Sequence, residues 1–90
     1  MFHGAVINSD VEVGNNCIIN SQSLIEHDVK IGSQVHISTG AKVNGGCKIG
    51  NGTFIGSGAV IRENVEIGIN CIIGAGAVIK KNIKNSLIIK

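Results

Sequence analysis

Aliphatic residues recur at every sixth position along most of this chain. When the sequence is written in blocks of six from Met1, fourteen blocks cover residues 1–84 and thirteen of them begin with Ile or Val. Ile and Val make up only 26 of the 90 residues, so composition alone does not produce this pattern. A fixed six-residue period predicts a repeat architecture.

The fourth and fifth positions of the blocks carry a second pattern. From Gly4 to Asn82, twelve of the fourteen fourth positions are Gly, Asn or Asp. These residue types tolerate the positive φ of a sharp turn. The fifth positions, from Ala5 to Ile83, hold small or branched side chains that fit beside a larger Ile in a tight interior. Each block therefore predicts a short extended segment closed by a corner.

Short strands joined by corners at this period are typical of a parallel β-helix. Three blocks make one coil of a triangular prism, so the fourteen blocks predict about 4.7 coils stacked about 4.8 Å apart. A β-sandwich, the alternative, needs longer hairpin-linked strands. We predict an all-β fold, with a β-helix over residues 1–84 and a C-terminal strand or tail over 85–90.

Composition and charge limit the classes of partner that this protein is expected to bind. Eight Lys and Arg against six Asp and Glu give a net charge of +2, too weak for a duplex-binding surface. The two aromatic residues, Phe2 and Phe54, do not supply the stacking platforms of single-strand binders. No apolar run approaches the length of a membrane span. We therefore expect neither a nucleic acid nor a membrane as partner.

The cysteines indicate a core role and a reducing compartment. Cys17, Cys47 and Cys71 are an odd number whose spacing fits neither a disulfide framework nor a CxxC metal pair. All three fall on the fifth position of a block, which predicts small, inert core residues rather than nucleophiles. The expected compartment is the cytoplasm.

Two histidines are candidates for chemistry. His27 stands between Glu26 and Asp28 at a predicted solvent-facing corner, and an imidazole beside a carboxylate suits general-base catalysis. The alternative is a surface histidine in an acidic turn. His36 follows nine residues later, half of an 18-residue coil, so the two imidazoles are predicted on opposite sides of the prism. If both act, the site lies between protomers packed about a threefold axis.

These segments resemble a known family. The hexapeptide background, with Ile25-Glu26-His27-Asp28-Val29 and Val35-His36-Ile37-Ser38, is similar to the hexapeptide-repeat acyltransferase superfamily. Within it, the chain resembles the sialic acid O-acetyltransferase and UDP-4-amino-sugar N-acetyltransferase group (NeuD/PglD-like). The resemblance implies a left-handed β-helix, a homotrimer with intersubunit active sites, and acetyl-CoA as donor. It also implies transfer of acetyl to an amino or hydroxyl group of a nucleotide-linked sugar or sialic acid, without a metal.

The resemblance also implies roles for individual residues. His27 would be the general base and Asp28 the acid that raises its basicity. Acetyl-CoA would lie against His36 and Ser38, and the acceptor near Asn20. Backbone at three further positions would line the pantetheine groove: Gly45, Ser57 and Ala75. For Gly45, corner geometry is an alternative explanation, and the C-terminal Lys80, Lys81 and Lys84 either attract the CoA phosphates or form a solvated end.

Two departures from this family keep a second hypothesis open. Members usually carry an N-terminal nucleotide-binding domain and a C-terminal Gly-x-Pro-Ala-Lys segment, and the 90 residues contain neither. The alternative is a catalytically silent trimeric β-helix that lacks the substrate-binding domain. A third reading, a zinc site of the γ-carbonic-anhydrase type, needs two histidines close in sequence, a spacing that His3, His27 and His36 do not have.

Overall fold

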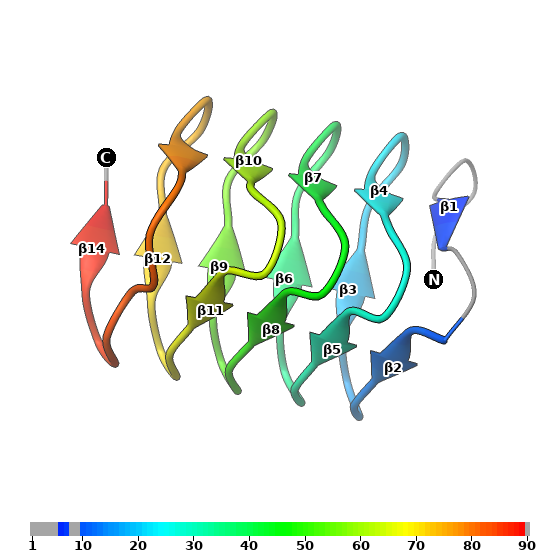
Figure 1. Cartoon of the computed structure of the whole chain (residues 1–90), viewed down its shortest axis with the longest axis horizontal. Helices are drawn as coiled ribbons and strands as arrows, with labels where there is room; N and C mark the ends of the chain where they lie inside the picture. Colours follow the sequence, from blue (N-terminus) through cyan, green and yellow to red (C-terminus); the bar gives the residue numbers. More distant parts are fainter. Residues whose placement is uncertain (1–5, 8–9, 90) are drawn as a thin grey trace.

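The chain winds into a short rod built of two-residue strands. The structure is a computed structural model, and it describes residues 6–7 and 10–89. Figure 1 shows the coils stacked side by side from β1 to β14. In the described residues the strands are β1 (Val6–Ile7), β2 (Glu12–Val13), β3 (Ile18–Ile19), β4 (Leu24–Ile25), β5 (Lys30–Ile31), β6 (His36–Ile37), β7 (Lys42–Val43), β8 (Lys48–Ile49), β9 (Phe54–Ile55), β10 (Val60–Ile61), β11 (Glu66–Ile67), β12 (Ile72–Ile73), β13 (Val78–Ile79) and β14 (Ile88–Ile89).

From β1 to β13 every third strand pairs in parallel, and β14 pairs with β12, which gives three sheets within the described residues. Sheet A has the order β1-β4-β7-β10-β13, sheet B the order β2-β5-β8-β11, and sheet C the order β3-β6-β9-β12-β14. Residues 18 apart are partners, as in Leu24↔Lys42 and Ile25↔Val43. The predicted left-handed parallel β-helix, a triangular prism of hexapeptide repeats, is confirmed.

The core is a stack of aliphatic side chains along the axis of the rod. First-position residues such as Ile25, Ile37 and Ile55 are fully buried, and fifth-position residues such as Val29 pack beside them. Val13 in β2, near the N-terminal end of the described rod, is 39% exposed, and Ile7 in β1 is half-buried. The core therefore extends along the rod rather than thickening, which lets a short chain bury a continuous interior.

The corners follow position in the repeat more strictly than residue type. Every fourth position from Asp10 to Gly76 has a positive φ, between 54° and 76°. Gln22 and Gln34 adopt this conformation as well, although Gln is not a residue type that favours it. The backbone N–H at this position donates to the coil before it, as from Gly46 to the His27 carbonyl at 3.0 Å.

The predicted register is wrong in the last coil, which is two residues shorter. Ile83 bridges to Ile67, and Ile88 pairs with Ile72, a spacing of 16 residues instead of 18. Asn82 consequently does not have the positive φ predicted for it, and Ser86 has one instead, at 61°. The shortening lies between β13 and Ile83.

In the shortened segment, a side chain takes the place of a backbone hydrogen-bond acceptor. The Glu66 N–H donates to Asn82 Oδ1 at 2.9 Å, whereas in the coil before it the Lys48 N–H donates to the Val65 carbonyl at 3.0 Å. The Asn82 amide thus replaces a backbone acceptor. β14 falls in the segment 85–90 and extends sheet C, and the division of the chain into 1–84 and 85–90 stays a prediction.

The three cysteines are free thiols on the inner side of the corners. Cys47 and Cys71 are buried and Cys17 is half-buried, which confirms their predicted interior position. The Cys47 and Cys71 thiols donate to the carbonyls of Arg62 and Lys84, at 2.9 and 3.1 Å. Across residues 6–7 and 10–89, no helix has the length and apolar character needed to cross a membrane.

Candidate functional site

His27 and Asp28 occupy an exposed corner between sheet A and sheet B. β4 ends at Ile25 and β5 begins at Lys30, so the tight turn presents both side chains to solvent. The φ of 60° at Asp28 makes the sharp bend. An imidazole in this place is accessible to a small molecule, and a carboxylate follows it directly in the chain.

Gly45 lies one coil further along the same corner. It follows His27 by 18 residues, and a Cβ at this position would stand 3.4 Å from the His27 carbonyl oxygen. The Gly45 carbonyl accepts from the Asn64 N–H at 2.9 Å, which ties it to the next coil. The absence of a side chain leaves a low surface beside the His27 corner, where a ligand can approach the backbone closely.

His36 belongs to a different side of the prism. It points outward from β6 in sheet C, half-buried, and its ring centroid lies 4.9 Å from that of Phe54 at an angle of 52°. Its Nε2 atom is 3.1 Å from Nδ2 of Asn20. Two side chains from neighbouring coils therefore hold the imidazole.

The remaining predicted residues follow the corner between sheet C and sheet A. Ser38 is buried there, one coil beyond Asn20, and its carbonyl accepts from Ser23 Oγ at 3.1 Å. Ser57 and Ala75 lie on the next two coils, both exposed and small. The Ser57 carbonyl accepts from the Gly76 N–H at 2.9 Å.

The predicted site residues thus form two groups on separate sides of one protomer. His27, Asp28 and Gly45 share the corner between sheets A and B, whereas His36 and the others lie on sheet C and the corner that follows it: Asn20, Ser38, Ser57 and Ala75. The structure does not bring the two groups together within a single chain. Chemistry that uses both groups needs a second copy to supply one of them.

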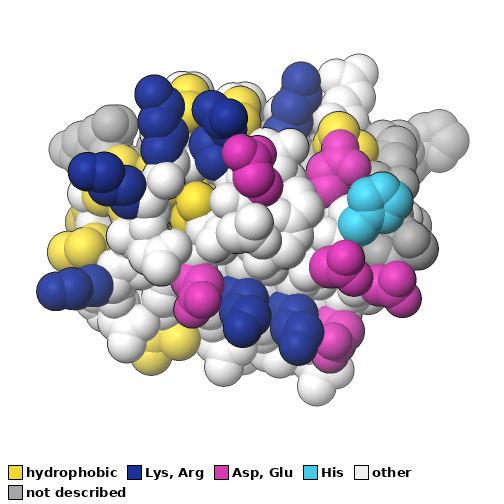
Figure 2. All heavy atoms as spheres, viewed as in Figure 1, with side chains coloured by type: hydrophobic (Ala, Val, Ile, Leu, Met, Phe, Trp, Pro, Cys, Tyr) yellow, Lys and Arg dark blue, Asp and Glu magenta, His cyan; other side chains and the backbone are white. Residues whose placement is uncertain are grey.

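The charges are distributed unevenly along the rod. Figure 2 shows Asp and Glu side chains close to the histidine on the face in view, and several Lys and Arg gathered toward the end that Figure 1 marks C. Lys80, Lys81 and Lys84 belong to this C-terminal end, and all three are exposed. An anionic ligand is therefore attracted to one end of the molecule more than to the other.

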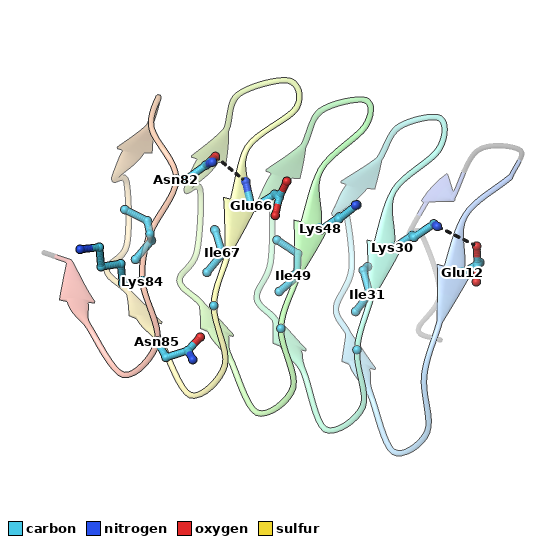
Figure 3. A pocket seen from close by; sticks show the side chains of 14 residues that line it. Glu12, Lys30, Ile31, Lys48, Ile49, Glu66, Ile67, Asn82, Lys84 and Asn85 are labelled. Atoms are coloured by element: carbon cyan, nitrogen blue, oxygen red, sulfur yellow. Dashed lines mark hydrogen bonds and ion pairs between the residues drawn. The ribbon is translucent and has the colours of Figure 1, made fainter.

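A shallow groove of about 600 Å³ runs along sheet B, and sequence reasoning did not identify it. Figure 3 shows charged side chains of both signs along it, with Lys30 and Lys48 in the middle and Glu12 and Glu66 on either side of them. Lys30 Nζ lies 3.9 Å from Glu12 Oε2. Lys84 lines this groove, whereas the residues of the two predicted groups do not. The groove can be found from the sequence by comparing residues 18 apart at the outward position of each strand.

Sheet C differs from sheet B in carrying a row of exposed apolar side chains. Ile18, Phe54, Ile72 and Ile88 are between 38% and 60% exposed, and they flank His36 in register along the outer face. We call this row the sheet C stripe. Exposed apolar side chains gathered on one face suit contact with another protein.

The histidines of the zinc hypothesis do not form a metal site in the described part of the chain. His27 and His36 lie on different sides of the prism, and no three His, Cys, Asp or Glu side chains among the described residues cluster in a way that could hold a metal ion. His3, the third histidine of that reading, lies outside the described residues.

The left-handed parallel β-helix of six-residue repeats places the chain among the hexapeptide-repeat proteins. The chain belongs to the bacterial transferase hexapeptide (six repeats) family, whose model matches residues 10–45, 28–63 and 46–81. A search of curated proteins finds no match.

Solved structures of similar fold include acetyltransferases. The acetyltransferase domain of PglB from Neisseria gonorrhoeae FA1090 is 25% identical, with a TM-score of 0.80 over 94% of this chain and 50% of that chain. PerB from Caulobacter crescentus, in complex with CoA and GDP-perosamine, is 27% identical, with a TM-score of 0.72 over 94% and 50%.

A third structure extends the likeness in fold. A hexapeptide transferase family protein from Anaplasma phagocytophilum is 23% identical, with a TM-score of 0.83 over 91% of this chain and 51% of that chain. The chain spans about half the length of each of these structures. The matches support acyl transfer as the general class of reaction.

Proposed function

We propose that this protein is an acetyl-CoA-dependent acetyltransferase with His27 as general base. The proposed acceptor is an amino or hydroxyl group of a nucleotide-linked sugar or sialic acid. The observation that carries the proposal is the exposed His27–Asp28 corner on a fold whose matches include the PglB acetyltransferase domain and PerB with CoA and GDP-perosamine. Asp28, next in the chain, would raise the basicity of the imidazole.

The proposed reaction is a direct transfer that uses one proton acceptor. His27 removes the proton from the acceptor N–H or O–H as the nitrogen or oxygen attacks the thioester carbonyl carbon. The C–S bond breaks, and the imidazolium returns the proton to the leaving CoA sulfur. Atoms and charge balance without an oxidant or a metal ion. The cysteines take no part, since Cys47 and Cys71 are buried in the core.

Small residues leave room for acetyl-CoA in the two groups of predicted residues. Gly45 has no side chain beside the His27 corner, and Ser57 and Ala75 are small and exposed on the other side. These positions suit a pantetheine arm that hydrogen-bonds to backbone groups. His36 and Ser38 are proposed to contact the donor, and Asn20 is proposed to lie near the acceptor. The Lys80–Lys84 end supplies positive charge for the CoA phosphates.

The proposed assembly is a homotrimer with its sites between protomers. The sheet C stripe offers an apolar surface, whereas sheet B presents charged side chains. A second copy packed against this side would bring the His27 corner of one protomer toward the His36 side of its neighbour. The proposed location is the cytoplasm, which the three free thiols favour.

One observation favours the second candidate function, a catalytically silent β-helix module. This chain spans about half the length of the matched structures, so half of each of them lies outside the match. In this case the protein trimerises without turnover. Calorimetry with acetyl-CoA separates the two proposals, because the silent module is not expected to bind the donor.

The test of the proposed function is CoA release with acetyl-CoA and a panel of nucleotide-linked amino sugars, including GDP-perosamine. Replacing His27 by Ala should lower kcat by about 10²–10⁴, the usual contribution of a general base. Lys48→Gln, on sheet B, is the matched surface control and should leave turnover unchanged. Undiminished turnover of His27→Ala would overturn the assignment of the base.

A further inference from the structure

The side chain of Asn20 meets the imidazole of His36 at hydrogen-bond distance. Asn20 follows β3 at a corner, and His36 projects from β6 in the next coil. The two nitrogen atoms, Asn20 Nδ2 and His36 Nε2, are 3.1 Å apart. An amide nitrogen can only donate a hydrogen bond, so Nε2 must accept it. A neutral imidazole that accepts at Nε2 carries its proton on Nδ1.

The corner that carries Asn20 is held firmly. Its backbone N–H donates to the Ile37 carbonyl at 2.9 Å, and its own carbonyl accepts from Ser23 Oγ at 2.7 Å. The amide therefore projects from a backbone fixed on both sides. Its position relative to His36 is set by the stacking of consecutive coils.

The His36 ring is restrained on its other side by Phe54. The ring centroids are 4.9 Å apart and tilted by 52°, and Phe54 is the in-register neighbour of His36 in sheet C. This contact limits rotation of the imidazole, because turning the ring would break the aromatic packing. The amide at one edge and the aromatic ring at one face therefore fix the orientation of the His36 imidazole.

We infer that Asn20 is a positioning residue that fixes His36 in the Nδ1–H tautomer, so that His36 acts as a hydrogen-bond donor and not as a base. The inference rests on the proposed function for its role in catalysis, since the Nδ1–H then points its hydrogen at an acceptor atom of the acetyl donor, such as the thioester carbonyl oxygen. The lone pair of Nε2 is already used by Asn20. The two histidines thus differ in role: His27 takes a proton and His36 donates a hydrogen bond.

The geometry also changes the part that the resemblance implied for Asn20. Its amide nitrogen is directed at His36, so its first role is to hold that side chain. We therefore expect substitution of Asn20 to change kcat/KM for acetyl-CoA rather than KM for the acceptor.

The test is ¹⁵N NMR of the histidine ring nitrogens at pH 8, where an ordinary imidazole is neutral. In the wild-type protein the His36 Nε2 signal should be that of an unprotonated nitrogen and the Nδ1 signal that of a protonated one. Asn20→Asp presents only acceptor oxygens, so it should reverse the pattern to Nε2–H. Asn44→Ala is the matched control, because its amide donates to the Ile61 carbonyl at 2.9 Å and should leave His36 unchanged.

The outcomes separate this inference from the proposed function. A wild-type Nε2 that carries the proton, or an Asn20→Asp pattern identical to wild type, overturns the inference whether or not the protein is active. Asn20→Ala should abolish the single-tautomer pattern, with circular dichroism showing that the fold is retained. If the protein turns over, Asn20→Asp should lower kcat/KM for acetyl-CoA by about tenfold, the loss of one hydrogen bond, and change KM for the acceptor little.

Discussion

Corner positions in this β-helix share one backbone conformation, although the residue types that occupy them differ. Asp28 has a φ of 60°, and Gln34, six residues later, has 59°. Asp28 therefore serves the turn whatever its chemistry, and its proposed catalytic role is added to a structural one. Substitutions at Asp28 should retain a residue that tolerates positive φ, such as Asn, so that the loss of charge is measured apart from the turn.

The Cys47 thiol gives a pH-dependent prediction at this scale. Burial raises the pKa of the Cys47 thiol above its ordinary value, and the Glu63 carboxylate acts in the same direction. In the unfolded chain the thiol ionises near its usual pKa of about 8.5. Between that value and the raised one, the folded state holds a proton that the unfolded state has lost.

The stability contributed by this thiol is therefore complete below about pH 8.5 and is lost as the pH rises toward the raised pKa. Urea unfolding between pH 7.5 and 9.5 should show a steeper fall in the free energy of unfolding for wild type than for Cys47→Ala. Equal slopes in the two proteins would contradict the burial argument.

At the scale of the strand and its corner, side-chain hydroxyls and thiols link consecutive coils. Thr53 Oγ1 donates to the Gly68 carbonyl at 2.7 Å and accepts from the Cys71 N–H at 3.2 Å. Ser23 Oγ donates to the Ser38 carbonyl at the equivalent place in its own block, five corners earlier. These buried bonds satisfy backbone groups that the two-residue strands leave unpaired.

Replacing Thr53 by Val should therefore destabilise the rod. Val keeps the size of the side chain but leaves a buried carbonyl and N–H without their partner, which costs about 1–3 kcal/mol. Thr53→Ser keeps the hydroxyl and loses one methyl group, a cost of about 0.8 kcal/mol. Chemical denaturation measures both, and a Val variant no less stable than the Ser variant would show that the hydroxyl bonds contribute little.

Much of the fold could be predicted from the sequence because each repeat determines its own strand and corner. The six-residue period placed Ile25 in the core, Asp28 in a turn and His27 at the surface, and the structure has them there. The shortened coil could not be predicted, since Asn82 is a residue type that fits a turn. Its side-chain bond to Glu66 is visible only when coils are stacked.

The candidate site was predicted less completely, because its contacts cross between coils. The pairing of Asn20 with His36 joins residues 16 apart, a spacing that no single repeat reveals. The groove on sheet B depends on side chains 18 apart in sequence. Contacts of this kind follow from the coil length and from the direction in which each side chain points, and neither is visible within one repeat.

At the scale of the whole molecule, the central feature is the separation of the two groups of predicted residues. His27 lies between sheets A and B, and His36 on sheet C. The sheet C stripe is a row of exposed apolar side chains on one side of the rod. Both features favour an assembly in which the site is completed by a neighbouring copy.

The oligomeric state offers a direct prediction. Light scattering after size exclusion should give a mass three times the 9.3 kDa of the chain. Ile72→Lys, in the sheet C stripe, should shift the protein to monomer because a buried charge in an interface is costly. Val78→Lys is the control and should stay trimeric, because Val78 lies on sheet A and is 52% exposed, against 45% for Ile72. A monomeric wild-type protein would contradict the proposed assembly.

The most direct test of the account is complementation between two inactive variants. His27→Ala and His36→Ala should each be nearly inactive alone, and co-expression should give mixed trimers in which one neighbour supplies His27 and the other His36. With equal amounts, both histidines are intact at about one site in four, so about a quarter of wild-type CoA release is expected. A double variant co-expressed with His27→Ala should remain inactive. If the two single variants together show no more activity than either alone, the proposed site between protomers is wrong.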